Sequence, residues 1–177
     1  KPTAADRPPP PPPPQADRYV PSLYFGIGPI APEGVHAPPA HSWVAPQRGI
    51  VMLRADESAA YWRSPAPAVA MRLASPYAHN CRDSFALLGL FAHNRQIYMN
   101  RQVTRGYARD YTRSILSHCG VMVDGQEPAF TYDTTTRSGF YDDVKFVAAS
   151  SPSLFDGLGA TRVLMLTDAY LFDAYRL

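Results

Sequence analysis

Two short segments carry residues of the kind that perform thiol chemistry. In the first, Asn80 and Asp83 flank Cys81 just ahead of an apolar run, a pattern typical of a capped helix N-terminus. The free N–H groups and dipole of such a helix, together with Arg82, favour the thiolate form of Cys81. In the second segment, His118 precedes a strand-like stretch and could supply the base that a reactive thiol needs. Cys81 and His118 are therefore the candidate catalytic residues.

The sequence resembles papain-like and peptidoglycan-type thiol hydrolases in one respect. In those families a cysteine opens a helix and a histidine lies on a following strand. The resemblance covers two short segments and implies Cys81 as nucleophile and His118 as base. Arg82 and Asp83 stand where that plan usually has small residues. The same pattern also fits a capped core helix with a half-buried cysteine, so thiol hydrolysis is an alternative function. The sequence as a whole favours a role without enzymatic activity.

Four arginines recur at intervals of four residues: Arg101, Arg105, Arg109 and Arg113. On a helix this spacing gives one continuous cationic stripe, and we expect a helix from about 100 to 116. An acidic partner surface, the phosphates of a nucleic acid or carboxylates of the same domain could face the stripe. A solvated helix face gives the same pattern. Nucleic-acid binding through these arginines is a second alternative function.

Short strands and one or two helices are interleaved after residue 49, which predicts an α+β domain with a small mixed or antiparallel sheet. The expected strands cover 49–54, 68–73, 120–123, 144–148 and 163–166, and the expected helices cover 83–92 and about 100–116. An Asp124-Gly125 pair follows the third strand and predicts a hairpin turn there.

The N-terminal part of the chain has the composition of an extended arm. Seven consecutive prolines, Pro8 to Pro14, predict a polyproline II segment. Large apolar groups follow among further prolines and glycines, and a purely flexible linker would not carry so many of them. Four aromatic residues are the candidate anchors: Tyr19, Tyr24, Phe25 and Trp43. We therefore divide the chain into a docking arm (1–48) and a single compact domain (49–177).

Composition and charge narrow the range of partners. The net charge of +2 is too small to attract nucleic acid or an anionic membrane in bulk, and no apolar run approaches the roughly eighteen residues of a membrane-spanning helix. Two lysines stand against fifteen arginines, which fits either an interface-rich protein or codon bias. Cys81 and Cys119 permit one disulfide at most, and whether they are bonded stays open. No zinc spacing and no phosphate-binding loop is present, so we predict no metal and no cofactor.

The arm, the arginine usage and the eleven tyrosines with two tryptophans together favour a structural or interaction protein. We expect a subunit or decorating component of a large multi-subunit assembly, such as a viral capsid or similar particle, that docks through its proline-rich arm. Its expected partners are the other protein subunits of that assembly, with nucleic acid as a second candidate. The sequence leaves the location of this soluble chain open, with a virion or another large particle as one alternative.

Overall fold

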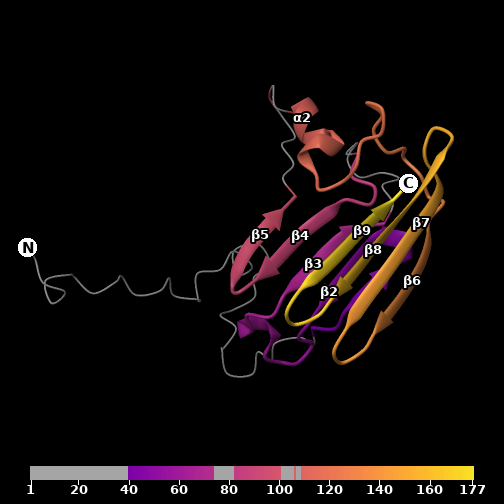
Figure 1. The fold of residues 1–177 in the computed structure, drawn as a ribbon. Helices are drawn as coiled ribbons and strands as arrows, with labels where there is room; N and C mark the ends of the chain where they lie inside the picture. Colours follow the sequence, from indigo (N-terminus) through magenta and orange to yellow (C-terminus); the bar gives the residue numbers. More distant parts are fainter. Residues whose placement is uncertain (1–39, 74–81, 101–105, 107–108) are drawn as a thin grey trace, which may run out of the picture. The chain divides into compact units, whose positions relative to one another are not determined.

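The computed structural model describes residues 40–73, 82–100, 106 and 109–177 of the chain (Figure 1). The chain divides into two units, Lys1–Ala37 and Pro38–Leu177, and all described residues belong to the second unit. Three of the predicted arm anchors, Tyr19, Tyr24 and Phe25, lie outside the described residues.

The described part consists of two antiparallel sheets in which the strands follow one another in chain order. The five-stranded sheet contains β1 (Trp43–Ala45), β2 (Ile50–Arg54), β3 (Ala68–Arg72), β4 (Leu87–Ala92) and β5 (Arg95–Met99). The four-stranded sheet contains β6 (Thr135–Phe140), β7 (Lys145–Phe155), β8 (Leu158–Leu166) and β9 (Leu171–Arg176). The helical elements are short: α2 (Arg109–Arg113) and the 3₁₀ turns η3 (Pro46–Arg48), η4 (Tyr61–Arg63) and η5 (Ile115–Ser117). Among the described residues, no helix has the length and apolar character needed to span a membrane.

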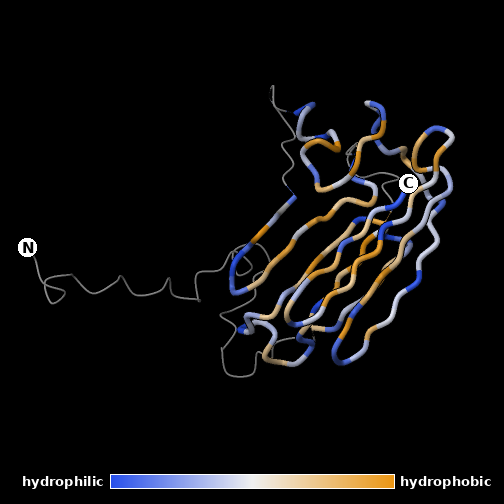
Figure 2. The backbone as a smooth tube through the Cα atoms, viewed as in Figure 1, coloured by the Kyte–Doolittle hydropathy of each residue, from blue (hydrophilic) through white to orange (hydrophobic). Residues whose placement is uncertain are grey.

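One hydrophobic core joins the two sheets, which makes the domain a β-sandwich. Val51 and Met71 enter this core from β2 and β3, while Val147 and Leu164 enter it from β7 and β8, and all four are fully buried. Successive residues of a strand point to opposite faces, so every second residue of these strands reaches the core. Figure 2 shows hydrophobic residues along the strands and hydrophilic residues in the turn between β6 and β7.

The α+β class predicted from the sequence is wrong, because segments expected as helices are strands or short turns. Residues 83–92 were expected to form a helix, but Leu87–Ala92 is strand β4. A short apolar run does not by itself distinguish a buried strand from a buried helix. The deciding signal is the pair His93 and Asn94, whose φ angles of 53° and 57° form the two-residue turn into β5.

The second predicted helix, at about 100–116, is not continuous. Gly106 has a φ of +84°, in the left-handed region that an α-helix does not contain. Beyond it, the structure has only the five-residue helix α2 and the turn η5. Residues 101–105 and 107–108 lie outside the described residues.

Four of the five predicted strands are confirmed as β2, β3, part of β7 and part of β8. The fifth, 120–123, is not a strand: Val123 forms a single bridge with Gln126 around the tight Asp124-Gly125 turn. β1 lies within the range expected for the arm, and pairs with β2 at the edge of the five-stranded sheet.

Candidate functional site: the outer faces of the sandwich

His118, the predicted base, is buried inside the domain. Its Nδ1 contacts the side-chain oxygen of Asn100. Burial lowers the pKa of His118 below its ordinary value, and the nearby carboxylates of Asp83 and Glu127 oppose this effect only in part. Cys81 lies outside the described residues, so its pairing with His118 stays a prediction.

The thiol of Cys119 is free and exposed. Among the residues that the structure describes, no group of three or more His, Cys, Asp or Glu side chains could hold a metal ion.

Of the four arginines in the predicted stripe, Arg109 and Arg113 are described and Arg101 and Arg105 are not. Arg109 is exposed on α2, and Arg113 lines a shallow pocket together with Glu127. Because Gly106 interrupts the expected helix, one continuous stripe on a single helix does not form.

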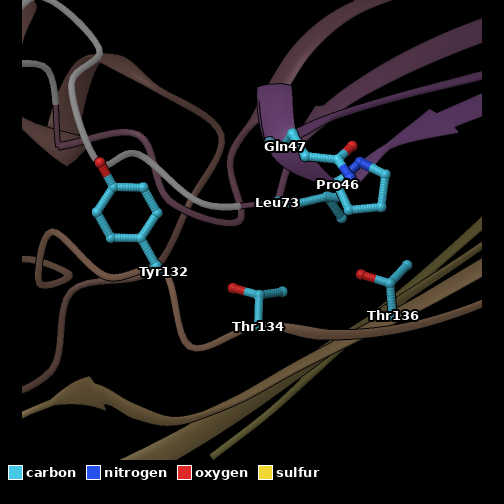
Figure 3. Close-up of a pocket in the computed structure, with 7 residues that line it drawn as sticks. Pro46, Gln47, Leu73, Tyr132, Thr134 and Thr136 are labelled. Atoms are coloured by element: carbon cyan, nitrogen blue, oxygen red, sulfur yellow. The ribbon is translucent and has the colours of Figure 1, made fainter.

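A cavity of about 250 Å³ lies beside the β1–β2 connection (Figure 3). It is lined by Pro46, Gln47, Gly49, Leu73, Tyr132, Thr134 and Thr136. Among the described residues that line it, the phenol of Tyr132 is the only ionisable side chain, so they offer no carboxylate, imidazole or thiol for acid–base or nucleophilic catalysis.

Arg162 of β8 makes polar contacts both within the four-stranded sheet and with segments next to β4. Its guanidinium donates to both carboxylate oxygens of Asp173, with Nε–Oδ1 at 2.9 Å and Nη2–Oδ2 at 2.5 Å. The remaining nitrogen, Nη1, donates to the backbone carbonyls of Phe85 and, at 2.6 Å, Cys119. This arginine therefore fixes the β8–β9 pair to the segments that flank β4.

The middle of the outer face of the five-stranded sheet is apolar, and Arg54 and Arg72 lie on either side of it. Trp43 pairs with Met52, which pairs in turn with Ala70, and all three point away from the core. Phe91 of β4 lies across the backbone of Gly89, where an added Cβ would stand 3.3 Å from the ring. Trp43 thus belongs to an exposed sheet face, not to a separate segment of the chain.

The outer face of the four-stranded sheet consists of three rows of side chains that run across β6, β7, β8 and β9. The polar row is Thr135, Ser150, Thr161 and Arg176. The middle row is Arg137, Ala148, Val163 and Ala174, and the aromatic row is Gly139, Phe146, Met165 and Phe172. Two of the three rows are thus mainly apolar, although they point away from the core.

Phe146 of the aromatic row packs against Tyr141 of the β6–β7 turn and against β6. The rings of Tyr141 and Phe146 stack at 6.4 Å between centroids with an interplanar angle of 19°. A methyl group on Gly139 would overlap the Phe146 ring, so the glycine leaves room for this ring to lie over β6. Phe146 is therefore held in place on the outer face.

Charges of opposite sign lie at the two ends of this outer face. The β6–β7 and β8–β9 turns lie at the same end of the sheet (Figure 1), and they carry exposed Asp142, Asp143 and Asp168. Arg137 and Arg176 are exposed nearer the other end, and exposed Asp133 and Asp156 lie beyond them, before β6 and in the β7–β8 turn. A hollow of about 480 Å³ lies at the end with Arg176, and its lining includes all four residues of the polar row.

The sequence contained a signal for this surface. In β8, Val163, Leu164, Met165 and Leu166 form a continuous apolar run, of which Leu164 and Leu166 reach the core. An antiparallel strand with one solvated face normally alternates apolar and polar residues. An unbroken run therefore indicates a strand with apolar residues on both faces.

No protein-family profile, no curated protein and no solved structure matches this chain.

Proposed function

We propose that this chain is a structural subunit of a larger protein assembly, in which neighbouring subunits cover the outer faces of its sandwich. The observation that carries the proposal is the apolar outer face of the four-stranded sheet, where Val163, Met165 and Phe172 point away from the core. Contiguous apolar patches on a protein surface mark interaction sites. The proline-rich arm at 1–48, with its aromatic residues, adds a second docking element on the evidence of its sequence.

The outer face of the five-stranded sheet supports the same proposal. Trp43 is 38% exposed and Phe91 is 45% exposed, and both lie on this face. Aromatic side chains are enriched in protein interfaces, where they contribute much of the binding energy. A sandwich with two apolar outer faces can bind a neighbour on each side, as a subunit in the interior of an assembly does.

The test is the native mass of the full-length chain in extracts of its source, combined with hydroxyl-radical footprinting. We expect a particle much larger than the 19.5 kDa monomer, in which Met165 and Trp43 are protected from oxidation compared with the purified chain at a dilution where it is monomeric. Tyr111, which is 60% exposed on α2 and lies on neither outer face, is the internal control. A monomer in the extract, with Met165 and Trp43 as reactive as in the purified chain, would contradict the proposal.

The arm is tested separately by removing residues 1–37, which leaves β1 in place. We expect the shortened chain to be recovered in smaller particles, or as a monomer. Unchanged particle size would show that the arm does not contribute to docking.

A further inference from the structure

We propose that the outer face of the four-stranded sheet binds the same face of a second copy of this chain, related by a two-fold axis that crosses the strands at the aromatic row. This inference rests on the proposed function, because it names the partner of one of the two outer faces.

The distribution of charge selects this axis. A two-fold axis across the strands reverses the strand direction in the second copy, so the end with the acidic turns lies over the end with the arginines. A two-fold axis along the strands would instead exchange the two edges of the sheet, placing Asp168 over the acidic β6–β7 turn of the second copy and Arg176 over the edge that carries Arg137. Only the first arrangement brings opposite charges together.

Both edges of the sheet give the same position for the axis. On the β9 edge, the midpoint between Arg176 and Asp168 along the chain is Phe172, in the aromatic row. On the β6 edge, the midpoint between Arg137 and the pair Asp142 and Asp143 falls next to Gly139, in the same row. This axis places each strand of one copy over the same strand of the other. Arg176 therefore meets the β8–β9 turn of the second copy, and Arg137 meets its β6–β7 turn.

The shape of the face agrees with this arrangement. About eight residues separate Arg176 from Asp168 along the hairpin, roughly 20 Å or more at the usual rise of a strand. With the axis at Phe172, the β8–β9 turn of each copy lies over the polar row of the other. That row lines the hollow of about 480 Å³, and Tyr170 in the turn is 58% exposed. The protruding turn of one copy thus faces the hollow of the other.

The apolar rows lie inside this contact. The aromatic row of one copy lies on the aromatic row of the other, so Met165 is close to the axis. The face is four strands wide, about 19 Å, and about 20 Å long, so the pair buries less than a standard interface of about 1,600 Å². We therefore expect a dissociation constant on the order of micromolar for the isolated pair.

The experiment is sedimentation of the full-length chain over a concentration series that brackets the micromolar range. We expect the mass to rise from 19.5 kDa towards twice that value. Met165→Glu places two like charges at the axis and is expected to keep the chain monomeric throughout the series. Leu116→Glu is the matched control, since Leu116 is 62% exposed in η5 and lies on neither sheet face.

Charge reversal identifies the pairing. Arg176→Asp and Asp168→Arg are each expected to weaken dimerisation about tenfold, because each places like charges together twice in the symmetric dimer. The double variant carrying both changes restores opposite charges and is expected to recover most of the affinity. If the double variant dimerises no more tightly than the single variants, the proposed axis is overturned.

A purified chain that stays monomeric at every concentration would overturn the inference as a whole. The native mass in the source extract separates this result from a failure of the proposed function. A large particle there, with Met165 protected, would mean that a different protein covers this face. A monomer in the extract as well would remove both proposals.

Discussion

Replacing Arg162 by methionine is expected to destabilise the fold strongly, because the change leaves polar groups without their partner. The guanidinium donates four hydrogen bonds, two to the carboxylate of Asp173 and two to the backbone carbonyls of Phe85 and Cys119. Each bond to a charged group is worth about 1.5–3 kcal/mol, so a simple sum gives at least about 6 kcal/mol. That sum is too large, because the Asp173 side chain is 30% exposed and regains part of its hydration.

Breaking a buried ion pair by removing one partner costs about 3–5 kcal/mol, and we expect Arg162→Met to fall in this range. A domain of this size has a total stability of about 5–15 kcal/mol, so the variant should remain measurable. The assay is urea unfolding followed by tryptophan fluorescence and circular dichroism. Arg95→Met, at an exposed position of β5, is the control and should change the free energy of unfolding by less than about 0.5 kcal/mol. A loss below about 1 kcal/mol for Arg162→Met would refute the assigned role of this arginine.

Two further predictions concern titratable side chains. Burial lowers the pKa of His118 below its ordinary value of 6.5, so His118 binds a proton more readily in the unfolded chain than in the folded one. The free energy of unfolding should therefore fall as the pH drops below about 6.5. Urea titrations across this range should show a weaker pH dependence for His118→Gln, and equal slopes for both proteins would contradict the prediction. Burial raises the pKa of Tyr175 to about 12, against the opposing effect of Arg162, so its contribution to stability is lost as the pH rises above 10 towards 12. Tyr175→Phe should remove a phenolate transition at about pH 12 from the ultraviolet absorbance. Little stability should be lost at neutral pH, because the Tyr175 hydroxyl has no hydrogen-bond partner among the described residues.

The strands that the sequence predicted correctly are those whose pattern is unambiguous over a short range. Ile50–Arg54 and Ala68–Arg72 are rich in β-branched or apolar residues and are bounded by glycine or proline segments. The error at β4 has a specific cause. Leucine and alanine favour helices, which led to the helix prediction for this segment. The turn that follows was not recognised, because His93-Asn94 is not among the residue pairs usually expected in a hairpin turn. Pairing with β3 and β5 decides the conformation of this segment, and such pairing is not a local property of the sequence.

The role of Arg162 could be predicted from the sequence only in part. It has the same strand parity as Leu164 and Leu166, so alternation places it on the buried face of β8. Its partner Asp173 lies eleven residues further on, and the two meet only because the β8–β9 hairpin places them on adjacent strands. The sequence therefore indicates a buried arginine that needs partners, while the register of the hairpin decides which partners it has.

The change from polar to apolar residues along the outer face indicates where a contact would end. The polar row contains hydroxyl groups and Arg176, whereas the next row along the same strands contains Ala148, Val163 and Ala174, with Arg137 at its β6 edge. All three rows come from the same four strands. If the whole face were solvated, polar residues would therefore be expected in each of the three rows. Protein interfaces have an apolar centre and a polar rim. Along β9, Phe172 of the aromatic row lies midway between Arg176 and Asp168, so the proposed two-fold contact would enclose the apolar rows between groups of opposite charge.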